Sequence, residues 1–394
     1  MTKELVLLDG ARTPMGEFNQ SLAEFTANEL GALAAQAALE RSEVAPAEID
    51  HTIVGNALQT SREAIYGARH VALKAGVPQE RPALTVNRLC GSGIQSIISG
   101  AHLLLNDEAT TCLVGGMESM SQAPHCIWGA RSGFRLGEGK LEDLLMAALY
   151  DPYCGCFMAQ TSNNLAREFG ISREEQDGFA LESQRRAAAA WDQGRLAEEV
   201  VPVEVGKGKR SRRFERDEHL RRETTLEGLA GLRPAFDDQG FVTAGNASGI
   251  VDGAAMLVLT TAERAAADGR RTLGKLRSWA TVGVDPSRMG IGPVPALRQA
   301  TSQIGLSVAD LDLIEINEAF AGQILAVIRE LDLDTGRLNV NGGAIALGHP
   351  LGATGSRLVL TLLYELRRRG GGIGAASACI GGGQGIAIVV ESTP

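Results

Sequence analysis

The chain has 394 residues, 22% of them charged and 44% hydrophobic, which excludes an intrinsically disordered polypeptide. Lys and Arg total 38 against 47 for Asp and Glu, so the net charge of −9 provides no positive field for a nucleic acid. At about 150 residues per domain, the length predicts two or three domains with a sizeable buried core.

Apolar runs alternate with helical patterns along the first 120 residues. Residues 5–8, 49–54, 85–87 and 112–114 read as short buried strands, and residues 28–40 and 94–105 have the apolar spacing of helices. Strands that alternate with helices predict an α/β sheet.

The second half of the chain repeats the first. The matched segments are residues 42–56 with 306–317, residues 85–87 with 339–341, and residues 113–116 with 379–382. Two similar halves should pack as one duplicated unit, which we expect to present its middle strand edge to an identical subunit.

The interval between the repeats has no counterpart in either half and predicts an inserted domain. The expected division is an N-terminal half of residues 1–119 plus 250–270, a loop domain of residues 120–249, and a C-terminal half of residues 271–394.

Membrane insertion and export are not expected. Residues 370–390 carry no charge but hold many glycines, which predict paired strands and a Gly-rich turn rather than a membrane helix. The first nine residues lack the apolar run of a signal peptide, and the last four carry no recognisable sorting signal. Six cysteines without a CxxC pair suit a reducing cytoplasm, and no metal-ligand spacing occurs.

Basic side chains cluster within residues 207–222, inside the predicted insert. Most of them are expected to be solvated. Because the cluster is local on an acidic protein, the alternative is a small phosphate-rich ligand, for which Arg221 is the best candidate.

Cys90 lies between a predicted strand and a predicted helix, flanked by Gly91 and Gly93. Unpaired N–H groups and the positive end of a helix dipole would stabilise a thiolate there, and the glycines would let a substrate approach the sulfur. The alternative is a small buried cysteine without a chemical role.

Three other residues could serve such a nucleophile. His349, held between Gly348 and Pro350, could accept a thiol proton near neutral pH, where imidazole titrates. Cys379 begins a glycine run whose bare N–H groups are suited to an oxyanion hole. Asn317 could hold a water or donate to an oxyanion. The alternatives are a structural histidine and a turn-forming asparagine.

These residues belong to five ordered blocks that resemble the signatures of the thiolases, the 3-ketoacyl-CoA thiolases and acetyl-CoA acetyltransferases. The similarity runs from residue 12 to the end of the chain and includes residues 246–249. The blocks are Asn87-x-x-Cys90-x-Ser92-Gly93, Gly115-Gly116-Met117-Glu118-Ser119-Met120-Ser121, Asn317-Glu318-Ala319-Phe320-Ala321, residues 341–355, and Cys379-x-Gly-Gly-Gly-x-Gly385.

The resemblance implies a five-layered α/β fold of two duplicated βαβαβαββ halves, with the site where central helix N-termini meet. It implies that Cys90 accepts the acyl group, that His349 is its base, and that Cys379 takes the α-proton of acetyl-CoA with a lowered thiol pKa. Asn317 would hold a water that forms one oxyanion hole with His349, and the N–H groups of Cys90 and Gly381 would form the other.

The resemblance also implies that coenzyme A and acyl-CoA are substrates, with no permanently bound cofactor and no metal. Arg221, Ala244 and Ser248 fall where the family binds CoA, and Met158 and Met289 fall at the acyl pocket. Phe157 stands where short-chain members usually carry His, so we expect an altered acyl preference, although the direction of the ring is open. Gly228 stands where the family often has Ser.

Residues 124–145 resemble the loop that joins two thiolase dimers, so a homotetramer is expected. Two alternatives stay open. A decarboxylating ketoacyl synthase of the same superfamily would need a second His or an Asn in place of Cys379. An inactive acyl-CoA-binding or redox-sensing protein would use Cys154 and Cys156 as its redox pair. Intact Cys90, His349 and Cys379 argue against it.

Overall fold

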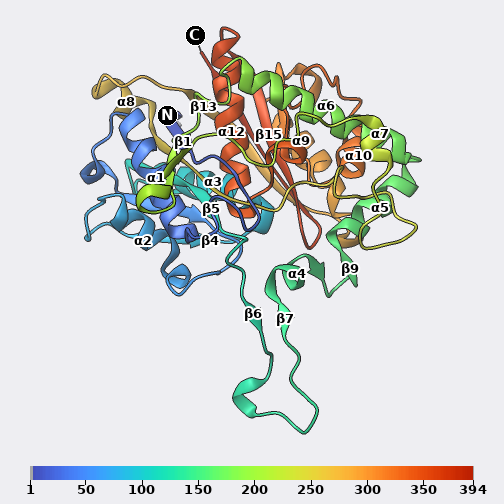
Figure 1. Ribbon diagram of the computed structural model, residues 1–394. Coiled ribbons are helices and arrows are strands. Elements are labelled where there is room, and N and C mark those ends of the chain that lie inside the picture. Colours follow the sequence, from blue (N-terminus) through green and yellow to red (C-terminus); the bar gives the residue numbers. More distant parts are fainter. Residues whose placement is uncertain (1–2, 394) are drawn as a thin grey trace.

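The computed structural model describes residues 3–393; Met1, Thr2 and Pro394, which belong to the two terminal segments, lie outside the described residues. One large mixed sheet dominates the fold (Figure 1). Its strand order is β14 (Leu313–Ile316), β15 (Gly372–Ile380), β16 (Gln384–Ser392), β13 (Gly274–Gly283), β1 (Leu5–Arg12), β12 (Val251–Thr261), β5 (Thr111–Glu118), β3 (His51–Gly55) and β4 (Ala83–Val86), with β2 (Gly16–Glu17) also pairing with β12.

The sheet is built from two equivalent halves. On one side of the centre, β5 is antiparallel to β12 and parallel to β3. On the other side, β15 is antiparallel to β16 and parallel to β14. The central strands β1 and β13 pair with each other. The predicted duplication is therefore confirmed, whereas the expectation of a free middle strand edge is wrong, because that edge is closed within the chain.

The register of the sheet corrects the sequence repeat. Gly55 at the end of β3 pairs with Gly116, and Ile316 at the end of β14 pairs with Ser377. Two residues further along, Glu118 and Cys379 occupy equivalent positions. The match of residues 113–116 with 379–382 is wrong because the first glycine pair lies inside β5 and the second lies in the turn after β15.

Helices form the other layers of a five-layered αβαβα arrangement. Helices α3 (Ser92–Leu105) and α12 (Leu351–Arg368) lie between the two halves of the sheet and share one apolar core with both. Helices α1 (Ala27–Arg41) and α2 (Gly67–Lys74) cover the outer face of the N-terminal half. Helices α5 (Met158–Glu168), α9 (Pro293–Ser302) and α10 (Ala321–Leu331) cover the outer face of the C-terminal half.

Glycines bring the starts of α3 and α12 together. A Cβ on Gly93 would lie 2.4 Å from the backbone nitrogen of Ser356, and a Cβ on Gly355 would lie 2.4 Å from that of Ile94. Only glycine permits this backbone approach. Because Cys90 precedes α3 and His349 precedes α12, the contact places both residues at one point of the core.

The segment between β5 and β12 folds partly onto the C-terminal half. A hairpin of β6 (His125–Cys126) and β7 (Glu142–Asp143) projects away from the body (Figure 1). The other elements are α4 (Leu144–Ala148), β8 (Tyr150–Asp151), β9 (Cys156–Phe157), α5, α6 (Arg173–Asp192), β10 (Val203–Val205), β11 (Arg212–Phe214) and α7 (Leu226–Ala230). Buried Arg12 of β1 binds Glu199 and Asp217 at 2.6 and 2.7 Å and so ties this segment to the sheet.

The predicted strand pair near the C-terminus is confirmed, since β15 and β16 are antiparallel across a glycine turn. Two short helices complete the chain, α8 (Ala262–Ala267) and α11 (Ala344–Leu347). Across residues 3–393, no helix is long and apolar enough to cross a membrane.

Candidate active site

Cys90 is held in a single turn immediately before α3. Leu89 adopts a left-handed conformation with φ of 47°, and its N–H donates to the Asn87 side chain at 2.9 Å. The Ser92 hydroxyl accepts from the Arg88 N–H at 2.8 Å and donates to the Leu89 carbonyl at 2.7 Å. These local bonds explain the Asn87 to Gly93 block, because each of them stabilises the turn that presents the Cys90 sulfur.

Two thiols and two backbone N–H groups meet at this turn. The N–H groups of Gly381 and of Cys90 itself lie near the Cys90 sulfur and favour its thiolate. Cys379 is buried at the end of β15 and packs with Met289 and Met158. It lies close enough to Cys90 for a charge on one sulfur to disfavour a charge on the other.

Burial controls the titration of both thiols. Burial raises the pKa of Cys90 to about 11, although the N–H groups of Gly381 and Cys90 favour the thiolate. Burial, with the nearby Cys90, also raises the pKa of Cys379 above that of a free thiol. The expectation of a stabilised thiolate at either cysteine is wrong, because the loss of water outweighs the helix end and N–H groups at Cys90 and the backbone hydrogen bond at Cys379. Both resting groups are neutral thiols.

His349 is fixed by a chain of hydrogen bonds. Its Nδ1 lies 2.6 Å from the Thr354 hydroxyl, which in turn donates to the Pro350 carbonyl at 3.0 Å. Since that hydroxyl proton is engaged, we assign the imidazole proton to Nδ1 and the lone pair to Nε2. The Asn317 amide nitrogen lies 3.2 Å from Nε2 and donates to it. Nε2 is therefore the ring nitrogen that can accept a proton.

Burial lowers the pKa of His349 to about 3, and the Arg357 charge contributes in the same direction. The expectation of an imidazole that titrates near neutral pH is wrong for the free protein, because the ring lies in the core. His349 is thus neutral over the physiological range, as a proton acceptor must be.

Asn317 has a buried oxygen available to a ligand. The residue follows β14, and its backbone N–H donates to the Ser377 carbonyl at 2.9 Å. Its side-chain oxygen is buried and has no hydrogen-bond partner among residues 3–393. A buried oxygen of this kind favours a bound water or a substrate N–H.

The neighbouring Glu318 fastens this strand end. It is fully buried and accepts from Ser183 at 2.7 Å, from the Asn339 side chain at 2.8 Å and from the Ile345 N–H at 3.2 Å. The next turn contacts the segment of residues 246–249, where the Ser248 N–H donates to the Ala319 carbonyl at 3.0 Å. Distant blocks of the sequence thus meet beside His349.

A cavity of about 550 Å³ opens above these residues. Phe157, Met158, Ala244, Ser248 and His349 line it, all of them predicted site residues. Met289 is placed differently: it is buried against Cys379, below the cavity.

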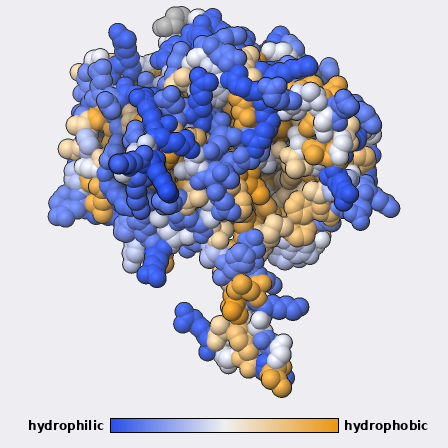
Figure 2. All heavy atoms as spheres, viewed as in Figure 1, coloured by the Kyte–Doolittle hydropathy of each residue, from blue (hydrophilic) through white to orange (hydrophobic). Residues whose placement is uncertain are grey.

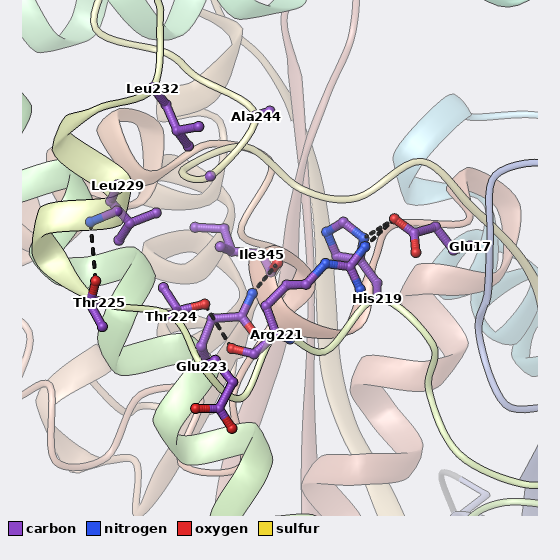
Figure 3. A pocket seen from close by; sticks show the side chains of 13 residues that line it. Glu17, His219, Arg221, Glu223, Thr224, Thr225, Leu229, Leu232, Ala244 and Ile345 are labelled. Atoms are coloured by element: carbon purple, nitrogen blue, oxygen red, sulfur yellow. Dashed lines mark hydrogen bonds and ion pairs between the residues drawn. The ribbon is translucent and has the colours of Figure 1, made fainter.

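A second cavity of about 390 Å³ adjoins the first and shares Glu17, His219 and Ala244 with it (Figure 3). Arg221 and Gly228 line this second cavity. Arg221 is half-exposed and pairs with Glu17. The predicted site residues that line one of the two cavities are Phe157, Met158, Arg221, Ala244, Ser248 and His349. Cys90, Cys379 and Met289 pack against residues that line the larger cavity.

Other members of the basic cluster are engaged on the surface. Arg213 pairs with Glu215, Arg222 pairs with Asp192, and Arg216 lies over the Trp191 ring. Only Arg221 of this cluster lines a cavity described above. The solvated interpretation of the cluster holds for these three, and Arg221 is the exception that was expected.

The ring of Phe157 points into an aromatic group at the cavity wall. Its centroid lies 5.1 Å from that of Tyr150 and 5.1 Å from that of Phe236. Phe157 and Phe236 both line the larger cavity. The ring direction that the sequence left open is thus toward the cavity.

Sequence reasoning missed His219, Phe236 and Thr354. His219 lies two residues before Arg221, so its neighbourhood was visible, but its place between two cavities was not. Thr354 follows His349 by five residues at the start of a helix, a spacing that can return a side chain to the loop. No motif or spacing in the sequence indicated that Phe236 would lie at the site. Among the described residues, no group of three or more side chains could hold a metal ion.

A partly buried cysteine at a helix N-terminus, a second thiol, a neutral histidine and backbone N–H donors beneath a joined cavity define a thiol-dependent acyl-transfer enzyme. The family model described as "Thiolase, N-terminal domain" matches residues 5–263, and "Thiolase, C-terminal domain" matches residues 270–392. The chain belongs to the thiolase family. It is an acyltransferase of the group that contains 3-ketoacyl-CoA thiolases and acetyl-CoA acetyltransferases.

Relatives match over nearly the whole chain. The mitochondrial 3-ketoacyl-CoA thiolase of Homo sapiens is 51% identical over 383 residues, which cover 97% of this chain and 96% of that protein. An acetyl-CoA acetyltransferase of Cupriavidus necator is 46% identical over 390 residues, covering 98% and 99%. The crystal structure of the human mitochondrial enzyme superposes with a TM-score of 0.98 at 50% identity over 100% of both chains. Its complex with CoA superposes with a TM-score of 0.97 at 50% identity, covering 100% of this chain and 98% of that one.

Proposed function

We propose that the protein transfers an acyl group between CoA and Cys90, and that it makes or cleaves the C–C bond of a 3-ketoacyl-CoA. In the first half-reaction the Cys90 sulfur attacks the thioester carbonyl of an acyl-CoA while its proton passes to Nε2 of His349. The C–S bond to CoA breaks, and the CoA sulfur leaves with the proton of Cys379, so that Cys379 becomes a thiolate while His349 keeps the proton from Cys90. Because the resting thiol is neutral, proton removal accompanies the attack.

In the second half-reaction the Cys379 thiolate removes the α-proton of acetyl-CoA, and the resulting carbanion attacks the acyl carbon on Cys90. The C–S bond to Cys90 then breaks, and the Cys90 sulfur takes its proton back from His349. The N–H groups of Cys90 and Gly381 face the Cys90 sulfur, so they are suited to stabilise the oxyanion that forms on the acyl group. Asn317, whose side-chain oxygen is free, would hold a water beside His349 and stabilise the enolate oxygen with it.

The observations that carry this proposal are that Cys379 lies beside Cys90, and that the helix starts which follow Cys90 and His349 touch each other. His349 also lines a cavity large enough for an acyl chain. Mass spectrometry after mixing with acetyl-CoA tests it. An enzyme acquires one acetyl group on Cys90 and loses it again on addition of free CoA. A non-catalytic binding protein would gain no covalent mass, and that result would overturn the proposal.

We assign CoA to the two joined cavities. Arg221 would bind a phosphate of CoA at the smaller cavity, and Ala244 and Ser248 would line the path of the pantetheine arm to Cys90. The support is the position of these residues along the cavities and the CoA complex of the human relative.

The acyl preference is expected to depend on Phe157. Its ring adds apolar area to the cavity wall, which favours a longer alkyl chain. Phe157→His should lower kcat/KM for 3-ketohexanoyl-CoA relative to acetoacetyl-CoA by about threefold or more, which is ~0.7 kcal/mol of discrimination. The same comparison with the 2-methyl analogue of acetoacetyl-CoA reports on branching.

Tyr153→His is the matched control. Tyr153 is an exposed aromatic residue in the turn between β8 and β9, the hairpin that contains Phe157, and it does not line the cavity. Ratios that move equally in both variants, or in neither, would assign Phe157 to packing alone.

We further propose that four chains assemble. The β6–β7 hairpin carries exposed apolar side chains, visible as orange spheres on the projection in Figure 2. They are Ile127, Trp128, Phe134, Leu136 and Leu141. Exposed apolar groups on a projecting hairpin are typical of a protein interface. Strand β4 is the edge strand of the N-terminal half: within residues 3–393 it pairs with β3 on one side only. Leu84 of this strand is exposed.

Light scattering of the purified protein should therefore report about four chains. A variant in which a short Gly-Ser turn replaces residues 127–141 should report about two, because the hairpin joins dimers and the β4 edge forms them. A monomeric full-length protein would contradict both contacts.

The division into residues 1–119 plus 250–270, 120–249 and 271–394 and the cytoplasmic location remain proposals. The division is supported by the return of the chain to β12 of the N-terminal half after the segment that carries the hairpin. The location is supported by six free cysteines.

A further inference from the structure

Glu118 belongs to a sequence block with no assigned chemical role, yet its carboxylate is buried and bonded to the helix start that follows His349. It ends β5 and is fully buried. One oxygen accepts from the Asn56 side chain at 2.7 Å and the Leu58 N–H at 3.0 Å. The other accepts from the Ala57 N–H at 3.0 Å and the Gly352 N–H at 2.8 Å. Four donors for two oxygens suit a carboxylate and no other side chain of this size.

The bond to Gly352 connects Glu118 to the catalytic histidine. Gly352 lies in the first turn of α12 and follows His349 by three residues. A carboxylate at a helix N-terminus is stabilised by the unpaired N–H groups and by the helix dipole. Glu118 therefore fixes the start of α12, and with it the direction of the loop that carries His349.

The duplicated fold gives the same position two uses. Glu118 and Cys379 are equivalent in the register of the two half-sheets, and the start of α12 is the counterpart of the start of α3. One of the two equivalent helix starts presents Cys90 beside Cys379. The other is filled by the Glu118 carboxylate.

Glu118 also acts on Cys90 through its charge. Its carboxylate adds to the burial that raises the pKa of Cys90. Burial raises the pKa of Glu118 itself to about 7, and buried Asp252 on β12 adds to this effect. A negative charge that disfavours the Cys90 thiolate is a cost to the nucleophile, so its presence calls for a benefit elsewhere.

We propose that Glu118 is a positioning residue that aims His349 at Cys90 through the N-terminus of α12; the inference rests on the proposed role of His349 as the base. The proposal makes two opposite predictions for Glu118→Gln. Loss of the charge makes the Cys90 thiolate easier to form. The Gln amide keeps one acceptor oxygen for four donors, so the donors that held the other oxygen lose their acceptor, which loosens the start of α12, displaces His349 and slows its proton transfer.

The test compares two reactions of Cys90 in the full-length protein. Alkylation by iodoacetamide, followed over pH by mass spectrometry, measures the thiolate and needs no base. Acylation by acetyl-CoA in a single turnover requires His349. In Glu118→Gln, alkylation at pH 8 should rise about threefold or more, whereas acylation should fall about 10- to 100-fold. Glu118→Asp keeps the charge and should recover part of the acylation rate.

Asp252→Asn is the matched control. It removes a buried carboxylate near Glu118 that accepts from the Ser121 N–H at 2.9 Å and leaves the Gly352 bond intact. It should change acylation by less than about threefold. Equal acylation in Glu118→Gln and wild type, or a parallel fall of both reactions, overturns the positioning role. Absence of acylation in the wild type would overturn the proposed function instead.

Discussion

Replacing Cys90 with Ala is expected to abolish acyl transfer and condensation, with a loss in kcat of about 10⁴-fold or more. The thioester on this residue links the two half-reactions, and the fold offers no substitute. Cys379 is the other thiol nearby, but it is buried beyond Cys90 and packs between Met289 and Met158. Thiolysis of acetoacetyl-CoA measures the rate, and mass spectrometry of the protein mixed with acetyl-CoA detects the acyl group.

Cys126→Ala is the control for this substitution. Cys126 is a free cysteine of the projecting hairpin, partly exposed and remote from the joined cavities. It should acylate and turn over as the wild type does. An acyl adduct on Cys90→Ala protein, at any cysteine and at the wild-type rate, would show that the nucleophile lies elsewhere.

The reactivity of Cys90 has to be generated in the reaction. At rest, burial keeps its pKa at about 11, and His349 is held neutral by a pKa lowered to about 3. At rest the proton is therefore on the Cys90 sulfur, and Nε2 of His349 has the lone pair that can accept it. Negative charge that develops on the substrate oxygen beside the N–H groups of Cys90 and Gly381 stabilises the transition state, where it matters for rate.

The sequence predicted the site well because its chemistry is concentrated in short blocks. Cys90 and His349 each stand in a turn whose glycines and helix start are visible in the chain, and Cys379 stands at the end of a strand before a visible glycine run. The titration of these groups could not be predicted the same way. Burial comes from packing between layers. It reverses the pKa direction that the helix end alone would give for Cys90, and it raises the pKa of Cys379, for which a lowered value was expected.

What stayed hidden depends on contacts between distant segments. Glu118 and Gly352 are 234 positions apart, and the bond between them exists only because two halves of the fold meet. Phe157 and Phe236 are brought together by the packing of the inserted segment, so the sequence left the ring direction open. The repeat itself was visible in the sequence, but residues 113–116 were matched to the wrong segment. The match relied on a glycine pair, and that pair lies in a strand in one half and in a turn in the other.

Replacing Cys379 with Ser is expected to separate the two half-reactions. A hydroxyl has nearly the size of a thiol but gives up its proton far less readily, and burial at this position disfavours the anion further. Acylation of Cys90 uses His349 and should be partly retained. Removal of the α-proton of acetyl-CoA should fall about 10²- to 10⁴-fold, the usual contribution of a positioned acid or base.

Deuterium incorporation into the methyl group of acetyl-CoA in D₂O, followed by NMR, measures proton removal directly, and mass spectrometry of the acetylated protein measures the other step. Cys126→Ser controls for the change from sulfur to oxygen. Because His349 is neutral and its Nε2 is the alternative acceptor in the site, it is the group that would replace Cys379 if the assignment were wrong. Exchange at the wild-type rate in Cys379→Ser would transfer the α-proton to that histidine, and the second thiol would then serve only to pack beside Cys90.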